Sequence, residues 1–355
     1  MRRRPGGLLL LLLALTQQLS AVGAAALSIL DFGGAPVRRS AAGGLSQPNN
    51  QRAIARAMAA CAAAGGCSLT FPRANDTGIA PEPWPYGSPI VTTYLTSAWN
   101  VTSHLKLVIP PGVAVRGTES FAENCGGSNT STCNSWEGSA SWPVLPNYVF
   151  PSHLQDPTAG HGAKQAWLRG YNLTNLTFTG GGMLHGGGAW WWCMRMLAAK
   201  QPGGPHAPSW CPRAVAAGQV PAFDLDAPPM IMIIGSTAIL WENLLVTHSP
   251  EWTLVHQYCS DIVIRNVTVF NPNNDTIEGP NTDGMDLFSC QKVHIHDVLV
   301  DVGDDMFAMD SGVDAAGRAM SIATADVVIE NSVVRNGHGL TLGSGASGGL
   351  RNVKT

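Results

Sequence analysis

Four side chains in the C-terminal third of the chain have the residue types that acid–base chemistry requires. Asp304 and Asp305 follow Gly303, Asp283 precedes them, and His338 comes later. Two like charges beside a third acid raise the pKa of at least one of them, so one carboxylic acid keeps its proton while another acts as a base. These residues therefore predict a general acid–base site.

Glycoside hydrolysis uses such a divided pair, because one acid protonates the leaving oxygen while one base activates water. Inverting enzymes hold the two carboxyl groups about 6.5–9.5 Å apart, close to the distance between side chains one or two stacked strands apart. The alternative is that these aspartates cap turns or bind calcium. Gly-Asp-Asp alone is a weak motif.

A repeat surrounds these residues and predicts how they are held. The repeat consists of an apolar residue, any residue, an Asn or Asp, and then alternating apolar residues. Its Asn or Asp, the landmark of the repeat, occurs at Asn175, Asn243, Asn266, Asp297, Asn331 and Asn352. The gaps from Asn243 onward are 23, 31, 34 and 21 residues, and no helical pattern lies in them. A recurring strand buries its face by stacking coil on coil. We expect an all-β, right-handed parallel β-helix; an antiparallel sandwich fits the irregular gaps less well.

Equal offsets from the repeat predict which side chains meet. Asp304 lies seven residues after Asp297, and His338 lies seven after Asn331. Regular coils would place the two side chains about 4.8 Å apart, and the loop before Asp283 can return that residue to the same column. Adjacent strand residues face opposite sides, so Asp304 and Asp305 could not both face one site from a regular strand. We therefore expect Gly303 to supply a bulge or turn.

The N-terminus has the pattern of a secretory signal peptide. Arginines at 2–4 precede the apolar run 8–15 and the small residues 21–26. We expect residues 1–26 to be removed and 27–355 to form one β-helix domain, secreted to the extracellular space or cell wall. The apolar run is shorter than the ~20 residues of a membrane span, so none is predicted.

Cysteines and glycosylation sequons agree with an oxidising compartment. The predicted disulfides are Cys61–Cys67, Cys125–Cys133 and Cys193–Cys211. The sequons are at Asn75, Asn100, Asn129, Asn172, Asn175, Asn266 and Asn274. Only 13% charged residues and a net charge of −3 exclude a nucleic-acid-binding composition. A polyanionic substrate would have to be met by local basic residues.

Two segments depart from the repeat. The run 51–66 predicts a capped helix, preceded by Asn49 and Asn50 and with Ile54, Met58 and Cys61 on one face, that covers one end of the sheet. The Gly- and Pro-rich segment 181–227 predicts an insertion or lid loop. Its residues 190–192 are tryptophans, which we interpret as packing anchors rather than a platform for sugar rings.

Three strings in order, NTDGMDLFSC, GDDMFAMDSG and GHGLTLGS, resemble the motifs of glycoside hydrolase family 28, the polygalacturonases. LDFGG and SPEWTLVHQYCSDIVIRNVTV resemble its plant-type members, and the similarity runs from Leu27 to the end. The resemblance implies that Asp304 is the general acid, that Asp283 and Asp305 hold and deprotonate the water, and that His338 orients the acid. It also implies that Asn281 shapes a sugar subsite. The reaction would be inverting hydrolysis of α-1,4-galacturonosyl linkages in pectin, by a monomer without metal or cofactor.

The chain departs from the family pattern in places. Met306 and Glu251 stand where other residues are commoner in the family. No R-I-K motif is found after G-H-G. Arg351 lies directly before the repeat landmark, so we do not count it as the arginine of that motif. The chain stops inside that strand, so we expect it to be C-terminally incomplete, which leaves its activity open. A calcium-dependent pectate lyase and a non-catalytic wall-polysaccharide-binding β-helix are the alternatives. The choice between endo and exo action, and among pectin types, stays open.

Overall fold

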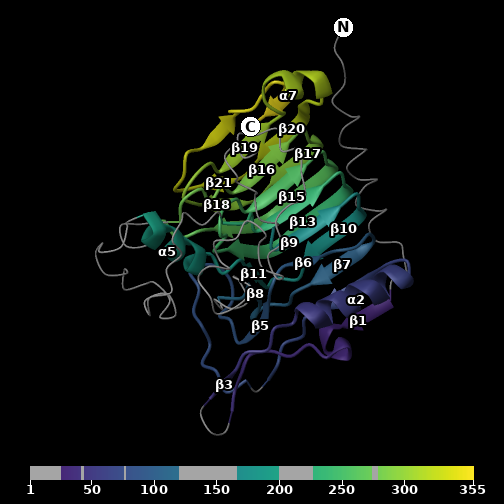
Figure 1. The fold of residues 1–355 in the computed structure, drawn as a ribbon, viewed down its shortest axis with the longest axis vertical. Coiled ribbons are helices and arrows are strands. Elements are labelled where there is room, and N and C mark those ends of the chain that lie inside the picture. The colour runs from purple at the N-terminus through teal and green to yellow at the C-terminus, as the bar shows by residue number, and fades with distance from the viewer. Residues whose placement is uncertain (1–24, 41–43, 76, 120–165, 200–226, 274–278) are drawn as a thin grey trace.

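The computed structural model describes residues 25–40, 44–75, 77–119, 166–199, 227–273 and 279–355. These residues form coils stacked along one long axis, from the N-terminal end to the C-terminal end (Figure 1). Every strand pair in the two large sheets is parallel, and only a small two-stranded sheet is antiparallel. The fold is the predicted right-handed parallel β-helix.

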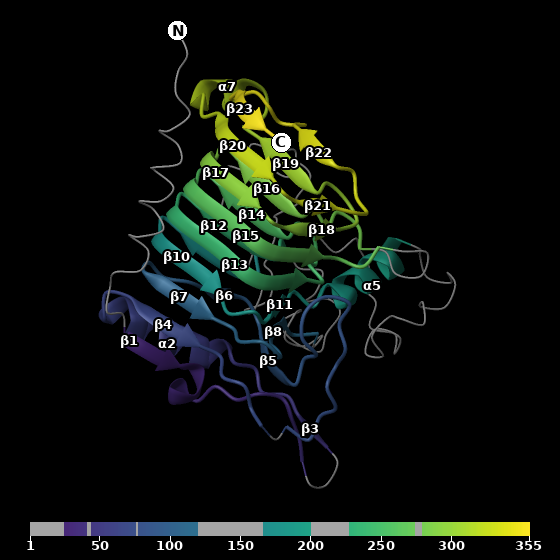
Figure 2. The same cartoon turned by 180° about the vertical axis from the view of Figure 1, so that it is seen from behind.

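The two large sheets run the length of the molecule (Figure 2). The 14-stranded sheet contains β1 (Ala25–Ser28), β4 (Cys67–Thr70), β5 (Thr92–Thr96), β7 (Leu105–Val108), β8 (Val113–Gly117), β10 (Thr174–Thr179), β11 (Met183–His185), β13 (Thr237–Thr247), β15 (Ser260–Phe270), β17 (Gln291–His296), β18 (Leu299–Asp301), β20 (Thr324–Glu330), β21 (Val333–Val334) and β23 (Leu350–Lys354). The seven-stranded sheet contains β6 (Trp99–Asn100), β9 (Leu168–Tyr171), β12 (Ile231–Ile234), β14 (Leu254–Gln257), β16 (Met285–Phe288), β19 (Phe307–Asp310) and β22 (Leu340–Leu342). The antiparallel pair is β2 (Arg38–Arg39) and β3 (Leu45–Ser46).

The repeat landmark marks one backbone conformation. All six landmark residues have φ between 48° and 58°: Asn175, Asn243, Asn266, Asp297, Asn331 and Asn352. Asn and Asp tolerate this left-handed conformation because their short polar side chains bond locally. The Asn266 amide Nδ2 also donates to Asn243 Oδ1 at 2.6 Å. Four of the six, Asn243, Asn266, Asp297 and Asn331, follow one another in register on neighbouring coils. Asn175 and Asn352 lie in a second column, opposite Ala238 and Asp326, so the prediction of a single column is wrong for these two.

Stacked apolar side chains fill the interior. Phe178, Trp241 and Ile264 occupy the same register position on β10, β13 and β15, and all three are fully buried. The rings of Phe178 and Trp241 stack with centroids 3.8 Å apart. Each coil thus covers the apolar face of its neighbour, as the repeat predicts.

The predicted N-terminal helix is α2 (Gln51–Ala63), beside β1 and β4 and after the short 3-10 helix η1 (Ile29–Phe32) (Figure 1). Its buried face includes the three predicted residues, Ile54, Met58 and Cys61. The side chain of Asn50 does not cap the helix; Asn49 Oδ1 instead accepts from the Gln51 N–H at 3.0 Å.

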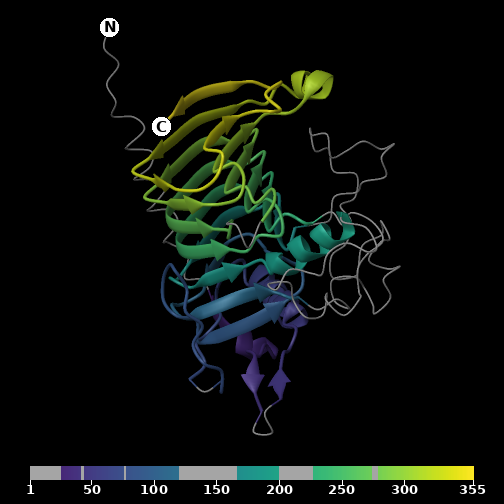
Figure 3. The ribbon, with the colours of Figure 1, turned by 90° about the vertical axis from the view of Figure 1, so that its left-hand side faces the viewer.

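The segment predicted as a loop from 181 to 227 is partly regular, so that prediction is wrong for residues 183–199. They form β11 and α5 (Gly188–Ala199), which projects from the coils (Figure 3). Ala, Leu and Met favour a helix there, and the flanking glycines obscured this in the sequence. Helix α7 (Asp314–Met320) lies in the 34-residue gap between Asp297 and Asn331, where the sequence showed no helical pattern. The tryptophans at 190–192 are at most 1% exposed, as expected for packing anchors.

The disulfide predictions differ in outcome. Cys61 and Cys67 are bonded, with Cα atoms 5.0 Å apart, as predicted. Cys193 is disulfide-bonded, while Cys211 and the pair Cys125–Cys133 lie outside the described residues, as does the predicted signal peptide up to residue 24. Within the described ranges, no helix is long and apolar enough to cross a membrane.

Candidate active site

The predicted catalytic residues lie on three neighbouring turns. Asp283 precedes β16, Asp304 and Asp305 connect β18 to β19, and His338 precedes β22. Met285, Phe307 and Leu340 are register partners on β16, β19 and β22. Counting two residues back places Asp283, Asp305 and His338 at one height.

The sequence analysis placed Asp304 at the same height as Asp283. The register of the strands places Asp305 there instead. Asp304 and Asp305 lie in a turn, where strand alternation does not apply, so both reach the same site. Gly303 supplies the predicted turn. A Cβ on Gly303 would lie 2.4 Å from the Gly279 carbonyl oxygen, so no larger residue fits.

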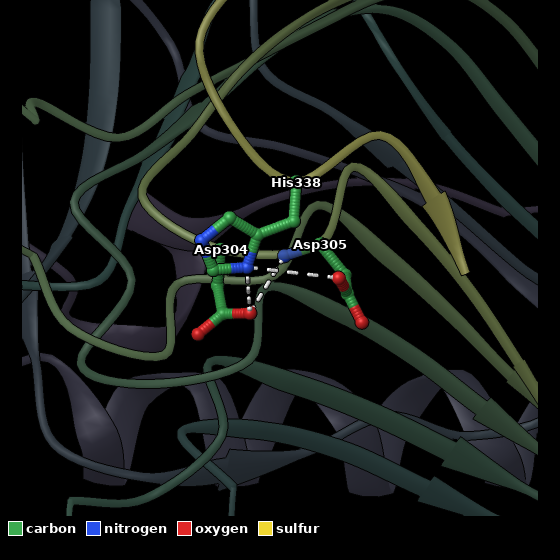
Figure 4. A group of neighbouring side chains, drawn as sticks. All are labelled: Asp304, Asp305 and His338. Atoms are coloured by element: carbon green, nitrogen blue, oxygen red, sulfur yellow. Dashed lines mark hydrogen bonds and ion pairs between the residues drawn. The ribbon is translucent and has the colours of Figure 1, made fainter. Parts of the chain in front are cut away.

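Both carboxylate oxygens of Asp304 have partners, and Figure 4 shows those of Oδ1. Its Oδ1 lies 3.0 Å from His338 Nδ1 and accepts from the Asp305 N–H at 2.9 Å. Its Oδ2 accepts from Asn281 Nδ2 at 3.2 Å. His338 Nδ1 also lies 3.8 Å from Asp305 Oδ1. Asn281 and His338 thus both contact the predicted acid.

Asp283 is the most buried of the three predicted carboxyls, with 7% of the residue exposed. Burial, followed by the charges of Asp304, Asp305 and Glu251, raises the pKa of Asp283 to about 8. A neutral carboxylic acid is cheaper to bury than a carboxylate. The carboxyl that keeps its proton at neutral pH is therefore Asp283, which the family resemblance assigns to the attacking water, and burial rather than the neighbouring charges is the main cause.

A groove of about 250 Å³ adjoins these residues. Its lining includes Asn281, Asp283 and Asp305, and also Trp252, Asp286, Phe288 and Asp310. Asp286 is 1% exposed, and burial, with Asp283 and Asp310 nearby, raises its pKa well above the ordinary carboxyl range.

Sequence reasoning missed Asp286 and Asp310. The signal was present, because each acid lies in an otherwise apolar strand, MDLF or FAMD, directly after one of the predicted motifs. Phe288 and Asp310 are register partners on β16 and β19, so the two strands bring these acids to one groove.

The basic residues near the end of the chain are not at this site. Arg351 and Lys354 lie on β23, which pairs with β20 in the 14-stranded sheet. The groove is bordered by strands of the seven-stranded sheet. Their position agrees with the expectation that Arg351 is not the arginine of an R-I-K motif.

The ligand atoms of Asp304, Asp305 and His338 lie within 4.8 Å of one another, close enough to hold a metal ion. Calcium takes six to eight oxygen ligands, whereas this set offers two carboxylates and one imidazole. Its donors therefore fit the calcium of the lyase alternative poorly. Hydrolysis without a metal stays a prediction.

The fold and the groove describe a parallel β-helical protein with an acidic groove beside its seven-stranded sheet. The model of the glycosyl hydrolases family 28 matches residues 148–355, more than half of the chain. The chain belongs to this family.

Several polygalacturonases are similar to this chain in sequence or in structure. A probable polygalacturonase of Vitis vinifera is 25% identical over 74% of this chain and 44% of its own length. A polygalacturonase of Cryptomeria japonica is 30% identical over 34% of this chain and 21% of its own. The chain thus spans less than half the length of these relatives. An exopolygalacturonase of Thermotoga maritima superposes with a TM-score of 0.62 at 20% identity, over 97% of this chain and 69% of that one. At that identity the likeness shows the fold alone.

Proposed function

We propose that this protein hydrolyses α-1,4-galacturonosyl linkages of pectin by an inverting acid–base mechanism. The observation that carries the acid–base part of the proposal is the cluster itself, while inversion is what the family resemblance implies. Asp283 and Asp305 line one groove and Asp283 keeps a proton, while Asp304, beside them, is contacted by a histidine and an asparagine. The names of the curated relatives supply the substrate class.

Asp304 is the proposed general acid, which protonates the leaving glycosidic oxygen. His338 and Asn281 contact its two carboxyl oxygens, so its direction is set before substrate arrives. Asp283 and Asp305, at one height on neighbouring coils, hold the attacking water. Since burial raises the pKa of Asp283 to about 8, Asp283 donates a hydrogen bond to the water while Asp305 takes its proton.

The same proposal includes the expected setting of the enzyme. Residues 1–26 are a signal peptide, residues 27–355 are one catalytic domain, and the mature protein is a glycosylated monomer outside the cell. Asn100, Asn172 and Asn266 are exposed and therefore open to glycosylation. Peptide mapping of secreted protein would detect the cleavage and the glycans.

Release of reducing ends from polygalacturonate tests the mechanism. Asp304→Asn should lower kcat by about 10²–10⁴-fold, because the acid is lost while the shape is kept. Asp297→Asn is the matched control, since asparagine is the usual residue at that landmark position and Asp297 is exposed. Equal activity of Asp304→Asn and wild type would reject the mechanism.

The two alternative functions, a lyase and a non-catalytic wall-binding protein, would give different results with polygalacturonate. An unsaturated product that absorbs in the ultraviolet and disappears with a chelator would identify a lyase. Binding of polygalacturonate without new reducing ends would identify a non-catalytic wall-binding protein. Formation of the inverted anomer in the first turnovers, followed by NMR, would support inversion.

A further inference from the structure

The turns that carry Asp304 and His338 are each preceded by a polar residue three positions earlier. Asp301 ends β18, and Arg335 directly follows β21. β18 and β21 are parallel neighbours, so the two polar residues lie on adjacent coils. Asn336 Nδ2 donates to Asp301 Oδ1 at 2.9 Å.

A residue from the other end of the chain joins this pair. Tyr86 Oη donates to Asp301 Oδ2 at 3.2 Å and accepts from Arg335 Nη1 at 2.7 Å. The Arg335 guanidinium carbon lies 5.5 Å from the centroid of the Tyr86 ring, and the ring packs edge-on against Phe270 at 5.2 Å. One hydroxyl therefore connects both coils.

The segment that carries Tyr86 is anchored, so it can act as a fixed support. Backbone hydrogen bonds of 2.8 and 2.9 Å join Glu82 and Ile90 around it. Trp84 packs edge-on against His185 and His248, with ring centroids 5.6 and 5.4 Å away. Residues 82–90 thus reach from the early coils to the coils of the active site.

The two turns continue from this junction to the catalytic pair without interruption. The Val302 N–H donates to the Asn336 carbonyl at 3.0 Å, and the His338 N–H donates to the Asp304 carbonyl at 2.8 Å. A shift of one turn against the other would therefore change the 3.0 Å contact between His338 and Asp304.

We propose that Tyr86 is a positioning residue for the Asp304–His338 pair. It acts through Asp301 and Arg335, which fix the offset between the two catalytic turns. Its effect on turnover rests on the proposed function, whereas its effect on the pair's geometry does not. Burial and the Asp301 charge raise the pKa of Tyr86, so its hydroxyl stays protonated and able to donate.

Tyr86→Phe tests the proposal, because it removes the hydroxyl and keeps the ring on Phe270. Tyr94→Phe is the matched control: Tyr94 Oη donates to the Pro72 carbonyl at 2.8 Å, away from the junction. We expect Tyr86→Phe to lower kcat about tenfold to a hundredfold with KM within about twofold, since small displacements of catalytic groups are costly. Tyr94→Phe should lower Tm without changing kcat.

A second readout separates this proposal from the proposed function. The ¹⁵N resonance of His338 Nδ1 reports its contact with Asp304, and it should shift in Tyr86→Phe but not in Tyr94→Phe. If the wild type shows no turnover, the proposed function fails and the resonance alone decides. An unchanged resonance in Tyr86→Phe, or the same shift in both variants, would overturn the positioning role.

Discussion

At the scale of single residues, Asp283 shows how burial divides chemically identical groups. It shares one site with Asp304 and Asp305, yet it alone of the three is buried, and its pKa is about 8. A carboxyl in that environment behaves as an acid or hydrogen-bond donor over much of the pH range. The same burial makes Asp283 a source of pH-dependent stability.

Asp283→Asn should stabilise the protein at pH 7.5 and leave its stability unchanged near pH 3. The folded pKa of about 8 lies above the ordinary value of 3.8, so between these values the folded state binds the proton that the unfolded state has released. Stability therefore falls as pH rises from about 4 to 8. Asparagine removes this loss, worth roughly 2 kcal/mol or more at pH 7.5.

Urea unfolding of both proteins at several pH values would measure this effect. Asp326→Asn, an exposed change that keeps an oxygen acceptor for Asn352 Nδ2, is the matched control and should not reproduce this pH dependence. A constant difference between wild type and Asp283→Asn from pH 4 to 8 would contradict the raised pKa.

The sequence could predict the residues that sit in short motifs, and less about those that do not. Asp304 and His338 were found because each lies seven residues after the repeat, whereas Asp283 and Asp305 were found from the motifs in which they sit. Asp286 was not, because its importance depends on which strand lies beside it. The choice of Asp305 over Asp304 as the register partner of Asp283 depended on the geometry of a turn, which spacing along the chain does not give.

At the scale of elements, the landmark asparagines fix where each coil bends. Asn243→Ala should lower the free energy of unfolding by about 1–2 kcal/mol, because alanine disfavours the left-handed conformation that Asn243 adopts at φ 52°. Asn243→Asp should be close to wild type, since aspartate tolerates this conformation and keeps an acceptor for Asn266 Nδ2. Chemical denaturation compares the two variants directly, and equal losses would show that the backbone conformation is not the cause.

Helices and strands whose apolar residues recur at a regular spacing could be predicted, and those without such a spacing could not. The register of the strands around Asn243, Asn266, Asp297 and Asn331 followed from the repeat, and α2 has a plain apolar face. The register of Asn352 did not, because it pairs with Asp326 instead of Asn331. Helix α5 lies among glycines and tryptophans that carry no clear helical period, and its partners come from distant coils. Trp192 Nε1, for example, donates to the Ser249 carbonyl at 3.0 Å.

At the scale of the whole molecule, charge opposes the proposed substrate. The net charge is −3, and the described lining of the groove contains no basic residue and four aspartates, of which the buried Asp283 and Asp286 have raised pKa values and add little charge at neutral pH. A polyanion approaching this surface meets repulsion that salt screens, because the Debye length falls from roughly 20 Å at 20 mM salt to below 10 Å at 200 mM.

KM for polygalacturonate should therefore fall about two- to threefold as NaCl rises from 20 to 200 mM, an estimate for screening a few exposed like charges. Highly methyl-esterified pectin, which is nearly uncharged, is the control and should show little salt dependence if it is cleaved. A KM for polygalacturonate that rises with salt would show instead that basic side chains dominate its binding. The sign of the salt effect thus reports whether the acidic groove or a cationic surface governs the approach of pectin.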